Sequence, residues 1–326
     1  MSHQFPHDAA FLPRTKLSYI NLPGLLSDGK RDRTARVSGF VCIQLGARCY
    51  LVFLRGGEPF HSGRIQPGER GAASLSEVLR LAATESERGE GGQIGYFGAS
   101  DAQLQAMLAT LVQEPVTWEP PLDLTRPEAI FGRLRERCFS GVMEMFDGER
   151  HHYLDFHEGA YRGGWFTDRD PTVAIPEFVR SLFEAAAGSL EVLLFPALDV
   201  LPQQAGPGLV DLYRRVIGGV LRELSTVVGR ETAFTMVRRG QALAAMNHAA
   251  AAAFQVTDEG RIAGDPVATP EALGDAVAGW LTETMVAASD HHGVDPAATI
   301  EKVARDSRFV LHEQGFFARL PWALAL

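Results

Sequence analysis

The chain has 326 residues, of which 46% are apolar, so it is long enough to bury more than one hydrophobic core. Its formal net charge of −9 argues against a broad surface for nucleic acid or anionic membranes. No apolar run reaches the roughly 20 residues that a membrane-spanning helix needs. The first residues lack the charged and apolar regions of a secretory signal, and we therefore expect a cytoplasmic, globular protein.

A repeated pattern organises the first two hundred residues. Ser38-Gly39 recurs as Ser140-Gly141, 102 residues later. A second set of matches lies 103 residues apart and pairs Tyr50, Leu51, Phe53 and Gly56 with Tyr153, Leu154, Phe156 and Gly159. Self-similarity of this kind indicates a supersecondary unit that is used twice. We interpret the matched residues Gly39, Tyr50, Phe53, Gly56, Gly141, Tyr153, Phe156 and Gly159 as structural, with aromatic anchors on strands and glycines where the chain turns.

Each copy predicts a hairpin, a helix and a closing strand. The hairpins centre on Gly46-Ala47 and on Asp147-Gly148, and a DG pair between alternating strands is a strong hairpin signal. Helices with apolar residues at helical spacing follow at 72–86 and 176–188, and apolar strands close the copies at 91–99 and 188–198. A short amphipathic stretch precedes each hairpin, at 21–28 and 126–137.

Helices dominate the rest of the chain. A helix capped by Ser100 is predicted between the copies, followed by a Pro-rich boundary. After a second such boundary the periodicity predicts four helices, at 209–229, 230–254, 270–290 and 296–315, and Thr269-Pro270 and Asp295-Pro296 are start signals for the last two. The predicted fold class is α+β: tandem repeated α+β modules at 17–115 and 122–200, then an all-α, four-helix-bundle-like domain at 206–326.

Sequence motifs for catalysis are absent. The chain has no GxxxxGK[ST], GxSxG or HExxH, and Cys42, Cys49 and Cys138 lack the spacing of a zinc site or a disulfide framework. We therefore predict no cofactor and favour a non-catalytic protein. The alternative of an enzyme stays open, with Glu283, Asp290 and Glu301 as acid/base residues by charge alone.

Two groups of histidines are candidate ligand or metal sites. The two-residue period of a strand places His151, Tyr153, Asp155 and His157 on one face, where two imidazoles and a carboxylate could hold a divalent metal. The alternative is a solvent-facing strand. His248 lies in an Ala-rich helix that reads as buried, where it is either a hydrogen-bonded core residue or a ligand to a bound molecule, and His312 is a weaker candidate.

The motifs of the repeat resemble the PATAN family, also known as DUF4388, of bacterial signalling proteins. The resemblance rests on Ser-Gly-Phe at 38–40, Tyr-Leu-Val-Phe at 50–53 and Gly56, and on the second-copy counterparts at 140–142, 153–156 and Gly159, with a closing strand from Gly188 to Leu194. It covers about residues 17–100 and 123–198 and does not reach the C-terminal helices. It implies a non-catalytic adaptor that engages receiver domains of response regulators in two-component systems.

We therefore expect an adaptor that acts by protein–protein contact, without nucleic acid or membrane partners. Aromatic residues and arginines are enriched where partners bind, which indicates Phe60, Arg64, Tyr161, Arg162 and Trp165 as an exposed binding patch. The alternative function is a ligand or cofactor sensor that uses the C-terminal helical bundle near His248. The partner, the pathway and the oligomeric state are left open by the sequence.

Overall fold

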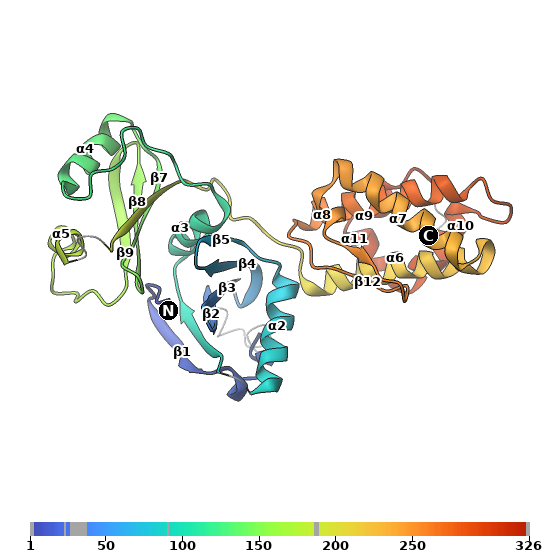
Figure 1. Ribbon diagram of the computed structural model, residues 1–326, viewed down its shortest axis with the longest axis horizontal. Coiled ribbons are helices and arrows are strands. Elements are labelled where there is room, and N and C mark those ends of the chain that lie inside the picture. The colour runs from blue at the N-terminus through green and yellow to red at the C-terminus, as the bar shows by residue number, and fades with distance from the viewer. Residues whose placement is uncertain (1–2, 23, 27–37, 90, 186–188, 324–326) are drawn as a thin grey trace. The chain divides into compact units, whose positions relative to one another are not determined.

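The structure is a computed structural model that describes residues 3–22, 24–26, 38–89, 91–185 and 189–323 (Figure 1). It is a mixed α+β protein with antiparallel sheets. The chain forms two compact units, one of Met1–Ala73 with Val78–Leu201 and one of Ser74–Glu77 with Pro202–Leu326. Among the described residues, no helix has the length and apolar character needed to cross a membrane.

The first unit contains a six-stranded sheet with the order β1-β6-β2-β3-β4-β5. Helix α2 (Leu75–Arg88) joins β5 to β6, and α3 (Asp101–Val112) follows β6, with Ser100 as the predicted N-cap that accepts from the Gln103 amide. The strands are β1 (Ala9–Lys16), β2 (Gly39–Leu45), β3 (Arg48–Arg55), β4 (Glu58–Gln66), β5 (Glu69–Ala72) and β6 (Gln93–Gly98), and a 3-10 turn, η1 (Leu17–Tyr19), follows β1.

The first unit also contains a four-stranded sheet with the order β10-β7-β8-β9. Its strands are β7 (Gly141–Phe146), β8 (His151–His157), β9 (Ala160–Phe166) and β10 (Glu191–Pro196). Helix α4 (Pro127–Glu136) precedes β7, and α5 (Ile175–Ala185) lies between β9 and β10. Strands β4, β5 and β9 lie in segments that the sequence interpretation treated as turns, because their alternation is interrupted by glycines.

Strand pairing in the two sheets agrees residue by residue at a constant spacing of 102. Gly39 stands opposite Leu54, and Gly141 stands opposite Phe156. The third strands, β4 and β9, each have one extra residue at the matching place, opposite the Phe53–Leu54 step of β3 and the Asp155–Phe156 step of β8. Glycine is required at positions 39 and 141 for the same reason. A Cβ on either would lie 2.1 Å from a carbonyl oxygen of the adjacent closing strand, so only glycine permits this close approach.

The aromatic matches do not follow this pairing. Tyr153 stands opposite Glu144, the register position of Leu51 and not of Tyr50, so the aromatic matches, which lie 103 residues apart, are one residue out of step with the strand pairing. A shift of one residue turns side chains to the other face of a sheet. Phe53 accordingly packs with α3, whereas Phe156 packs with α4 and α5. All four matched aromatics are buried on strands, as the structural interpretation expects, but Phe53 and Phe156 anchor different apolar clusters.

The turn after the second strand also follows the spacing of 102. Gly56 and Gly57 have φ of 56° and 81°, and Glu158 and Gly159 have φ of 50° and 79°. Both φ values are positive in each turn, as the tight hairpin connection requires. The predicted role of Gly56 and Gly159 as turn glycines is confirmed, although the counterpart of Gly159 is Gly57.

Helix α3 lies at the centre of the first unit. Its side chains Leu104, Met107, Leu108 and Leu111 are buried in one apolar cluster with residues of both sheets, including Phe40 and Phe53 from the first and Val142, Tyr153 and Phe195 from the second. A separate cluster joins the other face of the second sheet to α4 and α5. Strand β7 is thus buried on both faces, which explains its near-continuous apolar sequence.

The second unit is mainly helical. The core stripe of α6 is buried as predicted, and the indole of Trp280 donates to the Val237 oxygen at 2.8 Å between α9 and α7. Thr269 and Asp295 cap α9 and α10. Two predicted helices are interrupted, one at His248 and one at 305–307. The elements are α6 (Pro207–Val228), α7 (Arg230–Asn247), α8 (Ala249–Ala252), β11 (Gln255–Val256), β12 (Ile262–Ala263), α9 (Pro270–Ala288), α10 (Pro296–Ala304), η2 (Arg305–Ser307), α11 (Arg308–Glu313) and η3 (Phe317–Arg319).

Candidate functional site

An apolar groove lies on the second sheet of the first unit. It encloses about 580 Å³ and lies over β8 and β9 between α4 and α5. Its lining is almost wholly apolar and consists of Pro127, Phe131, Leu154, Tyr161, Ile175, Pro176 and Val179, together with Glu128 and Arg180. Binding sites of this size are typically apolar, with a few polar groups that fix orientation.

The local sequence explains why the groove exists. Pro127 starts α4 and Pro176 lies in the first turn of α5, so both helices begin beside the groove. Leu154 forms the floor of the groove, and Gly164 stands opposite it, where a Cβ would lie 2.8 Å from the Phe166 ring, so glycine lets that ring pack over β9. Tyr161 is 44% exposed, which is unusual for a large aromatic side chain and provides an accessible contact in the groove.

The groove has little capacity for acid–base catalysis. Glu128 and Arg180 come from different helices, and neither has a resolved ion pair among the described residues. Burial raises the pKa of the Tyr161 hydroxyl, with the Arg169 charge opposing this shift, so the phenol stays protonated at neutral pH. The groove can therefore bind apolar surface and offer one charge of each sign at its border.

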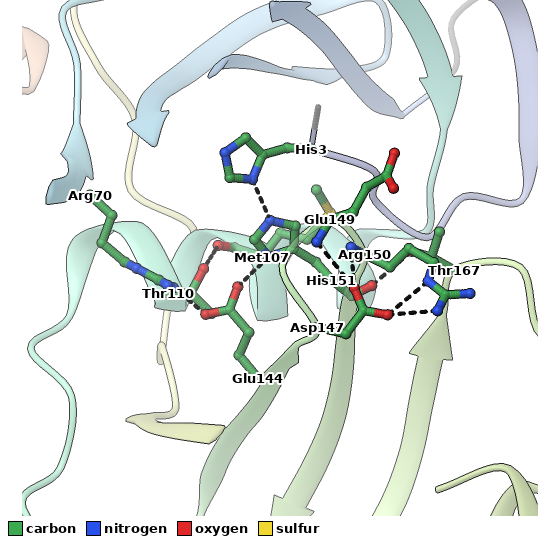
Figure 2. A network of polar contacts seen from close by, with 10 residues as sticks. All are labelled: His3, Arg70, Met107, Thr110, Glu144, Asp147, Glu149, Arg150, His151 and Thr167. Atoms are coloured by element: carbon green, nitrogen blue, oxygen red, sulfur yellow. Dashed lines mark hydrogen bonds and ion pairs between the residues drawn. The ribbon is translucent and has the colours of Figure 1, made fainter. Parts of the chain in front are cut away.

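A buried polar network lies on the other face of the second sheet (Figure 2). Glu144 of β7 accepts from Nδ1 of His151 through Oε1 at 2.8 Å, and its Oε2 accepts from Arg70 of β5 in the first sheet. The Nε2 atom of His151 lies 2.9 Å from Nδ1 of His3. Glu144 and His151 are each at most 1% exposed. The network thus ties both sheets to the N-terminal segment.

The backbone holds the N-terminal segment against the second sheet. The Gln4 amide donates to the Glu149 oxygen at 2.8 Å, and the His151 amide donates to the Gln4 oxygen at 2.9 Å. Asp147 shapes the adjacent turn by accepting from the amides of Glu149 and Arg150 and by pairing with the Arg150 side chain. These contacts position His3 beside His151.

Charge compensation stabilises the ionised form of Glu144. Burial opposes ionisation, but the hydrogen bonds and charges of His151 and Arg70 outweigh it, and the pKa of Glu144 lies below its ordinary value. Burial, with the nearby His151, lowers the pKa of His3 to about 4, so His3 is neutral at pH 7. Burial also raises the pKa of Tyr153 well above its ordinary value. With Glu144 hydrogen-bonded on both oxygens and ion-paired with Arg70, the network serves as a structural joint between the sheets.

A small polar cavity adjoins the network. It has a volume of about 280 Å³, and its lining includes His3, Arg70, Phe146, His151 and Glu191. Glu69, at its border, already accepts from Arg64 and Gln66. Acidic and basic groups alternate around it, so it does not select one sign of charge.

The predicted binding patch is divided by the fold. Tyr161 and Arg162 are exposed on β9, in agreement with the expectation. Trp165 is half-buried against the α3 cluster, and Arg64 is paired with Glu69. Phe60 is only 8% exposed, and the expectation that it contributes to an exposed patch is wrong, since β4 directs it into the core.

The predicted metal ligands do not converge. His151 and Tyr153 are buried, so the solvent-facing alternative is wrong for them, whereas His157 is exposed and Asp155 is half-buried. Within the described ranges, no group of three or more His, Cys, Asp or Glu residues could hold a metal ion. Burial raises the pKa of Asp155. Its partner on β9 is Gly163.

The other histidine candidates lie outside the core of the second unit. His248 forms the break between α7 and α8 and is half-buried, with Asn247 exposed, so the expectation of a buried core histidine is wrong. His312 is exposed. The residues of the buried network that sequence reasoning missed are His3, Arg70 and Glu144. A single acid within the apolar run Val142–Phe146 was the one available signal for them.

Comparison of the chain with protein-family models, with curated proteins and with solved structures finds no significant match. The site must therefore be interpreted from its own geometry.

Proposed function

We propose that the protein is a non-catalytic bacterial signalling adaptor that binds a partner protein through the groove between α4 and α5. The observation that carries the proposal is the combination of an open, almost wholly apolar groove of about 580 Å³ with an exposed tyrosine beside it. Exposed apolar surface of this kind costs solubility unless a partner covers it. The buried polar network on the other face of the second sheet ties this sheet to the first one and so supports the rigidity of the groove.

The two sheets, in this proposal, are copies of one α+β module with different tasks. The order β6-β2-β3-β4 in the first sheet matches the order β10-β7-β8-β9 in the second, and the register spacing is a constant 102 residues. Both observations support a common origin. The first copy braces the second through α3 and Arg70, and the second presents the groove. The helical unit would then serve as a further interaction domain of bundle type.

The partner class in this proposal is a receiver domain of a response regulator in the cytoplasm. The support is the resemblance of the repeated motifs to the PATAN family, together with the groove. Receiver domains are compact, and one apolar face of such a domain could place side chains in a groove between two helices. Arg180 and Glu128 on opposite helices would orient such a face.

Native mass spectrometry of the protein isolated gently from its host tests the adaptor function. We expect a complex with a second protein that Ile175→Asp or Tyr161→Asp removes, because each places a charge in the groove. Phe309→Asp is the matched control, since Phe309 is 73% exposed in the second unit. A complex that survives both groove changes, or a bound small molecule in the absence of any protein, would refute the proposal.

A further inference from the structure

Strand β9 presents an unpaired edge. It is the last strand of its sheet and pairs with β8 alone. Among the described residues, no backbone hydrogen bond from any other segment reaches 160–166. Its seven residues contain no proline and no lysine, and Arg162 is its single charge. Proline, lysine and short length are the usual means by which edge strands avoid pairing with other chains.

The other sheet edges of the first unit are protected. Strand β5 has four residues and covers Gly63–Gln66 of β4, the positions that correspond to the end of β9. Strand β1 contains Pro13 and two irregularities of register. Strand β10 ends at Pro196, and its Leu194 oxygen accepts from the Val116 amide at 2.7 Å. Among the described edge strands of this unit, β9 alone is longer than four residues and carries neither proline nor lysine.

The groove extends to this edge. Tyr161 belongs to both, and Leu154 on the groove floor stands opposite Gly164 of β9. A strand added beside β9 would direct every second side chain toward the groove side of the sheet. Arg162 on β9 and Arg180 at the groove are both exposed, and neither has an ion pair among the described residues, although the charge of Arg162 acts on Asp155. The charges near the edge therefore favour an acidic segment.

We propose, on the basis of the proposed adaptor function, that the partner contributes an extended segment that adds to the second sheet as a strand beside β9. The segment has apolar residues at alternate positions, which face the groove, and acidic residues near Arg162 and Arg180. Main-chain hydrogen bonds to β9 supply affinity, and the groove supplies specificity. A second copy of this chain would be hindered, because the first sheet and α3 occupy the face of the second sheet opposite the groove.

Selection of displayed random peptides of about ten residues against the full-length chain tests this proposal. We expect enriched peptides with alternating apolar residues and at least one acid. Binding should weaken at least about tenfold in Gly163→Lys, because a lysine is a common guard of edge strands. A Cβ at Gly163 meets nothing within 4 Å, and Asp155 stands opposite, so this variant should fold. Gly208→Lys in the second unit is the control, since a Cβ there also meets nothing within 4 Å.

N-methylation of an enriched peptide provides a second measurement that needs no protein variant. Successive amides of a strand point to opposite sides, so a strand added at one edge uses only every second amide. We expect methylation of one alternate set to abolish binding and methylation of the other set to leave it intact. The proposal is overturned if both sets are tolerated, if both abolish binding, or if no peptide is enriched. A dimer of the free chain that Gly163→Lys dissociates overturns it as well.

The same variants separate this proposal from the adaptor function. A host partner that is lost with Ile175→Asp but is unaffected by Gly163→Lys would leave the adaptor function intact and refute strand addition. Loss of the partner with both variants, and not with Gly208→Lys, supports both proposals.

Discussion

The buried joint can be tested by replacing Glu144 with glutamine. The variant keeps the shape of the side chain but removes the charge that compensates Arg70 and hydrogen-bonds His151. Removing one partner of a buried ion pair costs about 3–5 kcal/mol. The Arg70 side chain is 22% exposed and can turn partly to solvent, so we expect about 3 kcal/mol, at the lower end of that range.

Hydrogen exchange measured by mass spectrometry localises this effect. The two units need not unfold together, so a single unfolding transition would mix them. Peptides that cover β7 and β8 should exchange roughly a hundredfold faster in Glu144→Gln, whereas peptides of α9 in the second unit should be unchanged. The pKa of Glu144 is lower in the native chain than in the unfolded chain. Glu144 therefore contributes its full stabilisation above its unfolded-state pKa, and this stabilisation is lost as the pH falls through its native-state pKa. An increase below about twofold at pH 7 would refute the assignment of the network as a joint.

Three further predictions concern local packing and pH. Gly39→Ala and Gly141→Ala should each destabilise the first unit by about 2–3 kcal/mol in urea titrations, whereas Gly132→Ala, where a Cβ meets nothing within 4 Å, should be neutral or stabilising. The pKa of His152 is lowered by burial to about 4 from 6.5, so the native state binds fewer protons in that window and stability should fall by about 3 kcal/mol from pH 6.5 to 4. His152→Leu should reduce the fall by this amount and leave the part due to His3 and His61, whose pKa values burial also lowers to about 4, and an unchanged profile would show that His152 makes no contribution.

Sequence reasoning identified the elements that local chemistry determines. These elements depend on residues that are neighbours in the chain, and the structure shows each of them. They are the hairpin after Ser38-Gly39, the helix caps Ser100, Thr269 and Asp295, and the apolar stripe of α6. Strand β9 was missed because Gly163 and Gly164 interrupt its pattern. At Gly164 a Cβ would lie 2.8 Å from the Phe166 ring, so this glycine is explained by tertiary packing and not by a local turn.

The candidate site was less accessible to sequence reasoning. Exposure depends on which face a strand turns to the core, and the aromatic pattern of the second copy is offset by one residue from its strand register. Phe60 and Tyr161 therefore looked alike in sequence but differ in the fold, the first buried beside Phe53 and the second exposed at the groove. His3 and Arg70 could not be linked to Glu144, because they lie 141 and 74 residues away and meet only through tertiary packing.

The two sheets differ in the connection that leaves their third strands. After β4 the chain turns back as β5, which covers the β4 edge and carries Arg70 to Glu144 of the second sheet. After β9 the chain leads through residues 167–174 into α5 without forming a strand, so the edge stays open and Tyr161 stays exposed. One change in connection therefore supplies the cation of the joint in the first sheet and the open edge in the second. A chimera that places residues 67–72 after β9 should cover the edge by the same pairing, and it should abolish peptide binding while the groove lining is unchanged.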